Sequence, residues 1–169
     1  MCETGTESCQ FGKTIECIVL FRDGMRILGL DIGSKTIGVA VSDELCLIAQ
    51  GVSTLKRRGL DHDIHEILRL IEEREISKVV VGLPKNMNNT LGPSAEMVLA
   101  FIKRLNENVS VPVITWDERL STVAAEKVLL EADMSRAKRK RVVDKVAAML
   151  ILQGYLDSQV RLKNTHRKQ

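Results

Sequence analysis

Residues 25–43, MRILGLDIGSKTIGVAVSD, consist of two apolar runs that are separated by a short turn. The first run, residues 26–31, ends on Asp31, and the second, residues 36–42, has its apolar side chains at alternate positions. Alternation with a period of two is typical of a β-strand that is buried on one face. The stretch therefore predicts two antiparallel strands. It also raises a question, because a buried strand gains nothing from a carboxylate at its end. Either Asp31 is a turn residue, or the fold delivers a negative charge to a fixed point.

The hydrophobic period changes between strand and helix along the rest of the chain. Residues 62–74 carry apolar side chains at the spacing i, i+3, i+4 and i+7 of an amphipathic helix. The uninterrupted β-branched run at residues 79–81 is typical of a central parallel strand that is covered on both faces. Further elements are expected as strands at residues 47–55 and 111–115, and as helices at residues 95–105, from about Ser121 or Thr122, and at about 140–157. Helices follow where parallel strands need crossovers, so the order predicts an α/β fold with a mixed sheet.

The composition fits one globular domain. The chain has 169 residues, of which 44% are hydrophobic and 28% charged, and this length is enough to bury a core. Aromatic residues make up only 3%, so the core must be aliphatic, and the base-stacking platform of single-strand binders is not expected. No run approaches the roughly 18 apolar residues that a membrane span needs, so we expect a soluble protein.

The first 24 residues differ from the rest. They carry a net charge of −2, and since the total is +3, the other 145 residues carry +5. They lack the basic start and the clean apolar stretch of a signal peptide. We expect residues 1–24 to be a loosely ordered extension, with an extra edge strand from Ile15 to Phe21 as the alternative.

The four cysteines show no metal-binding or redox pattern. Cys2, Cys9 and Cys17 lie in the N-terminal extension, Cys46 stands alone, and no pair has the C-x-x-C spacing. Reduced thiols in a cytoplasm are therefore the expectation.

Acidic residues lie where a sheet of this kind would gather them. Asp31 ends the first strand, and Asp117 and Glu118 end the strand in WDERLST. Loops that follow parallel strands lie at one edge of the sheet, where ligands bind. Asp144, in DKVAAML, precedes apolar residues at i+3, i+4 and i+7, so it is expected on the helix face that packs toward the sheet.

Each acid also has a purely structural explanation. Asp31 would hold a turn, Glu118 would pair with Arg119 or cap a helix, and Asp144 would pair with Arg141 or Lys145. Together, however, three acids at one edge would repel one another unless a cation lay among them. Mg²⁺ takes oxygen ligands and completes its shell with phosphate, and two such ions about 4 Å apart clamp the reacting oxygens of a phosphodiester. The set therefore points to a nuclease.

The glycines near Asp31 are compatible with this function but do not single it out. Gly33 and Gly38 leave room for backbone or phosphate, and tight-turn geometry would explain them equally well. DIGSKTIG alone also matches the phosphate loop of sugar kinases and actin-like ATPases. Those enzymes use two lobes that close on the nucleotide, and one domain of this length does not supply them.

Four motifs in order, LGLDIGSKTIGVAVSD, VVVGLPKNMNNTLGPSA, WDERLST and DKVAAMLIL, resemble those of the YqgF (RuvX) family of the RNase H-like superfamily. The resemblance covers residues 25–158 and leaves residues 159–169 as a basic C-terminal tail. It implies an RNase H-like fold with a five-stranded mixed sheet, three strands antiparallel and two parallel, flanked by helices. It also implies that Asp31, Glu118 and Asp144 are the catalytic, metal-binding acids. The family is assigned to pre-16S rRNA processing or to Holliday junction resolution.

Basic and amide side chains are the candidates for contact with nucleic acid. Five cations within six residues precede Asp144, a run that either solvates a helix start or contacts phosphates. The expected nucleic-acid-binding residues are Lys35, Lys85, Asn86, Arg119, Arg136, Lys138, Arg139, Lys140 and Arg141. The run 56–58 and the cations of the tail are equally well explained as solvated surface. His62 and His65 are interpreted as surface residues rather than metal ligands.

The sequence thus predicts a hydrolase of ester bonds: a cytoplasmic, Mg²⁺- or Mn²⁺-dependent endonuclease, acting as a monomer or homodimer without a membrane. Precursor rRNA is the first expected substrate. A four-way DNA junction is the alternative, and it would require a stable dimer with paired sites. A non-catalytic nucleic-acid-binding module is the alternative from another class, although three carboxylates would hinder rather than help the binding of phosphate.

Overall fold

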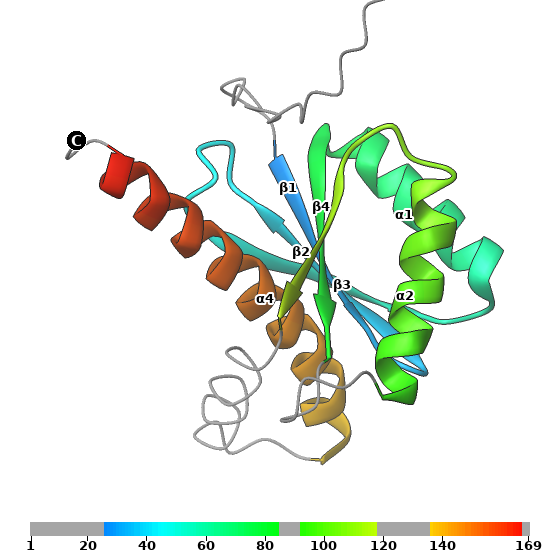
Figure 1. Ribbon diagram of the computed structural model, residues 1–169. Helices are drawn as coiled ribbons and strands as arrows, with labels where there is room; N and C mark the ends of the chain where they lie inside the picture. The colour runs from blue at the N-terminus through cyan, green and yellow to red at the C-terminus, as the bar shows by residue number, and fades with distance from the viewer. Residues whose placement is uncertain (1–25, 85–91, 118–135, 167–169) are drawn as a thin grey trace, which may run out of the picture.

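The computed structural model describes residues 26–84, 92–117 and 136–166, and in the last helix it describes side chains from Asp144 to Leu162. Five strands form one sheet in the order β3-β2-β1-β4-β5 (Figure 1). They are β1 (Arg26–Ile32), β2 (Thr36–Ser42), β3 (Ala49–Lys56), β4 (Ile76–Leu83) and β5 (Val113–Asp117). The first three are antiparallel neighbours, whereas β4 and β5 run parallel to β1. The predicted mixed α/β sheet is confirmed.

Helices cover both faces of this sheet. α1 (Leu60–Glu73) and α2 (Pro93–Asn106) lie on one face, and α4 (Arg136–His166) lies across the other (Figure 1). α1 and α2 are the crossovers that let β4 and β5 run parallel to β1. Pro93 stands in the first turn of α2, as expected, because a missing N–H is harmless there.

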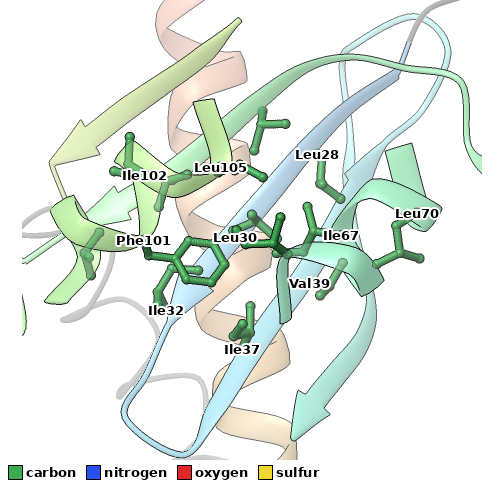
Figure 2. Close-up of a cluster of buried hydrophobic side chains, with 14 of the residues drawn as sticks. Leu28, Leu30, Ile32, Ile37, Val39, Ile67, Leu70, Phe101, Ile102 and Leu105 are labelled. Atoms are coloured by element: carbon green, nitrogen blue, oxygen red, sulfur yellow. The ribbon is translucent and has the colours of Figure 1, made fainter. Parts of the chain in front are cut away.

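The larger core lies between the sheet and the α1/α2 pair. Figure 2 shows Leu28, Leu30 and Ile32 of β1 and Ile37 and Val39 of β2 beneath side chains of the two helices. The helical side chains of this cluster include Ile67, Leu70, Phe101, Ile102 and Leu105. Phe101 is the only aromatic ring in the described part of this cluster, in line with the aliphatic core that the composition predicts.

The opposite face is built for close approach of a helix. α4 packs on Ile27, Ala40 and Val80 through residues that include Ala148 and Leu152. Glycines in β1 and β2 remove side chains from its path. A Cβ at Gly29 would lie 2.7 Å from the Leu152 Cβ, and a Cβ at Gly38 would overlap the backbone carbonyl of Asp144. The backbone of α4 therefore rests almost directly on the sheet.

The C-terminal half of α4 is anchored by polar and aromatic contacts. The Lys78 Nζ donates to the Tyr155 hydroxyl at 3.1 Å, and the Tyr155 ring meets Trp116 edge-on at 5.7 Å between centroids. The Gln153 amide accepts from the Ala49 N–H and donates to the Leu47 carbonyl. With this half of the helix fixed, the position of Asp144, further toward its start, is fixed too.

Some boundaries differ from the sequence-based prediction. The helix expected over 140–157 runs from Arg136 to His166, because no glycine or proline follows Gly154 to end it. Residues 159–166 of the expected tail are thus helical. β5 begins two residues later than predicted, at Val113, because Pro112 has no N–H for the ladder, although its carbonyl accepts from the Val79 N–H.

Two expected segments lie outside the described residues: the extension 1–24 and the helix from about residue 121. None of the described helices is long and apolar enough to cross a membrane.

Candidate active site

Asp31 lies at the edge of the sheet where the parallel strands end. It is the next-to-last residue of β1 and pairs across the ladder with Gly38 of β2. β4 and β5 end together at the same edge, where Leu83 is the register partner of Asp117. This is the edge at which ligands bind in open α/β sheets, as the sequence predicts.

Asp144 reaches the same place from α4. Its backbone carbonyl lies against Gly38, the residue that pairs with Asp31. Its carboxylate Oδ2 accepts a hydrogen bond of 2.7 Å from the Thr36 hydroxyl Oγ1 at the start of β2. The fold therefore brings together two acids that are 113 positions apart in the sequence, as the helical stripe in DKVAAML predicts.

The two carboxyl groups affect each other electrostatically. The pKa of Asp31 is raised from 3.8 to about 6, first because burial disfavours the charged form and second because of the negative charge of Asp144. A turn residue needs no such environment. The charged form of Asp31 is therefore less favourable than that of an ordinary aspartate, and a cation between the two acids would offset this cost.

Stability of the metal-free protein is expected to depend on pH through Asp31. The folded protein binds the proton of the Asp31 carboxyl group more tightly than the unfolded chain does. This proton therefore stabilises the folded state fully below about pH 4, and the stabilisation is lost as the pH rises through about 6. Two pKa units correspond to roughly 2–3 kcal/mol. In urea unfolding with chelator present, the free energy of unfolding of Asp31→Asn should therefore rise relative to that of the wild type as the pH is raised from 4.5 to 7.5. A stability difference that is independent of pH would contradict the environment described for Asp31.

A buried ion pair holds the turn that follows Asp31. Arg57 donates from Nη1 to the Gly33 carbonyl at 3.1 Å, and its backbone N–H donates to the Lys35 carbonyl at 3.0 Å. Its Nε donates to the Asp63 Oδ2 at 3.0 Å, and the Asp63 side chain is only 3% exposed. Arg57 thus couples the β1–β2 turn to the start of α1. For Arg57, the interpretation of the run 56–58 as solvated surface is wrong, because its guanidinium points inward.

Arg57→Lys is expected to lower the free energy of unfolding by about 1–2 kcal/mol. An ammonium is a point charge and cannot replace the planar fork that reaches Asp63 and the Gly33 carbonyl together. Denaturant unfolding measures the change, with the exposed Lys103→Arg as the control. Wild-type stability in Arg57→Lys would show that the fork geometry is unimportant.

Most of the predicted nucleic-acid contacts lie outside the described residues. These are Lys85, Asn86 and Arg119, together with the acid Glu118. The cations Arg136, Lys138, Arg139, Lys140 and Arg141 belong to the first turns of α4, but their side chains are outside the described part as well. Lys35 is described, and it is exposed on the turn after Asp31.

Sequence reasoning missed both Thr36 and the inward orientation of Arg57. Thr36 lies inside the DIGSKTIG motif, but nothing in the sequence indicates that its hydroxyl reaches a residue 108 positions away. For Arg57 a signal existed, because alternation at the end of a strand places it on the opposite side from Lys56 and Arg58.

The donor set suits a hard divalent cation. Two carboxylates and a hydroxyl oxygen converge here, and Mg²⁺ and Mn²⁺ prefer oxygen ligands. Within the described ranges no three His, Cys, Asp or Glu residues form a metal cluster, and Glu118 lies outside those ranges. His62 and His65 are exposed on α1, and neither belongs to a metal cluster among the described residues.

The mixed five-stranded sheet, covered by two helices on one face and a long helix on the other, defines an RNase H-like fold for this protein. Its fold is similar to that of Thermus thermophilus RuvC in complex with a Holliday junction substrate, with a TM-score of 0.55 and 17% identity over 80% of this chain and 96% of that one. The fowlpox virus resolvase bound to Holliday junction DNA has a TM-score of 0.51 and 16% identity, over 80% and 99% of the two chains. At these identities the likeness concerns the fold alone.

The chain belongs to the RuvX family, whose model, described as Holliday junction resolvase, matches residues 25–158. A relative from Clostridium kluyveri is 59% identical over 133 residues, which cover 79% of this chain and 97% of the relative. A relative from Desulforamulus reducens is 55% identical over 134 residues, covering 79% and 98%. Both carry the name "Putative pre-16S rRNA nuclease".

Proposed function

We propose that this protein is a metal-dependent endonuclease that processes the 5′ end of precursor 16S rRNA. One observation carries the proposal: the fold brings Asp31 of β1 and Asp144 of α4 together at the ligand-binding edge of the sheet. Burial and the charge of Asp144 raise the pKa of Asp31 there. Such a pair is unfavourable without a cation between the two acids, whereas hydrolysis of a phosphodiester uses it to hold a divalent cation.

In this function Asp31, Glu118 and Asp144 are the catalytic acids that hold Mg²⁺, or Mn²⁺ in its place. When bound, the cation supplies charge for the scissile phosphate and lowers the pKa of the attacking water. The protein supplies the geometry. Thr36 holds the Asp144 carboxylate by its hydrogen bond, and Gly38 lets the backbone of α4 approach β2.

Cations around the two acids are proposed to hold the substrate backbone. Arg136, Lys138, Arg139, Lys140 and Arg141 lie within two turns of α4, just before Asp144. Like charges three or four positions apart on a helix repel one another, and bound phosphates would relieve this repulsion. Lys35, Lys85, Asn86 and Arg119 are proposed to contact the same strand from the turns and loops that follow β1, β4 and β5.

The relatives favour RNA as the substrate. Proteins 55–59% identical over nearly their whole length carry the pre-16S rRNA nuclease name, so this chain is proposed to act on the same precursor in the cytoplasm. The description of the family model favours a second candidate, the four-way DNA junction. Symmetric resolution of a junction would require two copies with paired sites, whereas RNA processing needs only one.

The test is cleavage of labelled substrates by the full-length protein in Mg²⁺, Mn²⁺ or chelator. One substrate is an RNA that spans the upstream precursor and the 5′ end of mature 16S rRNA, and the other is a four-way DNA junction. The proposal predicts metal-dependent cutting of the RNA. Cutting of the junction alone would replace rRNA processing with junction resolution, and binding without cutting of either substrate would leave a non-catalytic module.

Thr36→Val is expected to raise the Mg²⁺ concentration for half-maximal cleavage about tenfold, because the Asp144 carboxylate loses the hydroxyl that orients it. Valine has nearly the same shape, so the fold should persist. Thr36→Ser keeps a hydroxyl and should stay close to the wild type. An unchanged Mg²⁺ requirement in Thr36→Val would remove Thr36 from the site.

A further inference from the structure

A hollow of about 240 Å³ lies where the end of the edge strand β3 meets the start of α1. Leu55 lines it together with six polar or charged residues from both elements and the segment between them: Thr54, Lys56, Arg58, His62, Asp63 and Glu66. The active-site acids do not line it, so it is a separate feature of the surface.

Both acids in this hollow already have cationic partners, although Arg69, the partner of Glu66, is shared with Glu73. The Asp63 Oδ2 accepts from the Arg57 guanidinium, and its Oδ1 accepts the Arg58 backbone N–H at 3.0 Å. Glu66 pairs with Arg69 at 2.9 Å. Lys56 and Arg58 are exposed, and among the described residues neither side chain forms an ion pair with a carboxylate. The hollow therefore presents positive charge that is not compensated within the described structure.

The hollow is next to the candidate active site. Lys56 is the register partner of Thr36, whose hydroxyl holds Asp144. Residues that face each other across an antiparallel pair have Cβ atoms roughly 5 Å apart on the same face of the sheet. Lys56 thus lies one strand outward from the residue that orients Asp144, and a strand of nucleic acid leaving the acids in this direction would pass over it.

The segment that carries the two cations is held in place. The Arg57 backbone N–H and guanidinium bind the Lys35 and Gly33 carbonyls of the turn that follows Asp31. The Arg57 guanidinium also lies over the ring of Phe101, with 5.8 Å between its carbon and the ring centroid. This contact anchors the segment to the core. Lys56 and Arg58 flank Arg57, and both are exposed, whereas the Arg57 side chain is only 17% exposed. The backbone that carries them is therefore already fixed when an anion binds, and only the two side chains have to be ordered.

We propose that this hollow, the β3 subsite, binds a backbone phosphate of the substrate strand beside the cleavage position, with Lys56 and Arg58 as its cationic contacts. The inference rests on the proposed nuclease function, and it adds the direction in which the strand leaves the active site, outward over β3. Because phosphates are common to all sequences, the β3 subsite contributes affinity and register but no base preference.

The experiment measures binding of the fluorescein-labelled precursor RNA by fluorescence anisotropy, in chelator, across a series of salt concentrations. The test variant is Lys56→Gln/Arg58→Gln. The control is Arg74→Gln/Lys103→Gln, which removes the same charge from exposed positions near the C-terminal ends of α1 and α2, at the opposite edge of the sheet. Thermal unfolding verifies that both variants remain folded.

The β3 subsite predicts that the test variant binds about tenfold more weakly and loses about 1.4 from the slope of log affinity against log salt, the value for two phosphate contacts on a single strand. The control should stay within about twofold of the wild type. Equal losses in both variants, or no loss in either, would overturn the β3 subsite. Cleavage by the wild type is scored separately. If the wild type cuts the RNA and the test variant binds it as tightly as the wild type does, only the β3 subsite is refuted. If the wild type binds the RNA without cutting it, only the nuclease function is refuted. A wild type that neither binds nor cuts the RNA refutes both.

Discussion

Asp31→Asn is expected to lower the rate of RNA cleavage at least about a thousandfold while leaving the protein folded. An amide keeps the shape of the side chain but removes the charge that would hold a divalent cation beside Asp144. A thousandfold loss of rate corresponds to about 4 kcal/mol of lost transition-state stabilisation. Single-turnover cleavage at saturating Mg²⁺ measures it directly.

The matched control for this prediction is Asp157→Asn. Asp157 is an exposed acid on the same helix as Asp144, and its carboxylate accepts only from Gln153 among the hydrogen bonds described for it. Its removal should leave cleavage within about twofold of the wild type. Comparable activity in Asp31→Asn and Asp157→Asn would show that the pair at the sheet edge is not the catalytic centre.

Gly38→Ala should damage both stability and activity. The added Cβ would overlap the Asp144 carbonyl, and neither backbone can give way as a flexible side chain would. Overpacking of this kind costs about 3 kcal/mol, and a displacement of α4 by about 1 Å at Asp144 costs about a hundredfold in rate. Urea unfolding and single-turnover cleavage measure the two effects.

Gly29→Ala separates the loss of stability from the loss of geometry. Its Cβ would meet the same helix two turns further along, 2.7 Å from the Leu152 Cβ, on the same face of the sheet. We expect a similar loss of stability but a smaller loss of cleavage, because Asp144 is farther from the disturbed contact. A larger loss of cleavage in Gly29→Ala than in Gly38→Ala would argue against the close packing of Asp144 on β2 as a determinant of activity.

The sequence predicted the elements of the fold well because their periodicities are local. The β-branched run around Val80 and the stripe that begins at Asp144 each reflect the burial of one element. The alternation at residues 36–42 marks only one buried face of β2, because the small residues at the other positions are buried under α4. The length of α4 was underestimated because its apolar stripe stops near residue 157. The helix continues through exposed residues such as Leu162, which need no partner in the core.

The site was predictable only in part because its details depend on distant contacts. The position of Asp31 follows from strand order, and that of Asp144 from helical spacing. The hydrogen bond from Thr36 and the contact of Gly38 with α4 depend on how the helix lies on the sheet, which no local pattern encodes. The inward orientation of Arg57 likewise requires its partner Asp63 on α1.

The most direct test of the central claim is Mn²⁺ binding by titration calorimetry, without nucleic acid, to the wild type, Asp31→Asn and Asp144→Asn. If the two acids form a cation site, the wild type binds Mn²⁺, and each variant binds at least about tenfold more weakly while its fold is retained. Equal Mn²⁺ affinity in all three proteins would contradict the claim, because the acids that the fold brings together would then hold no metal.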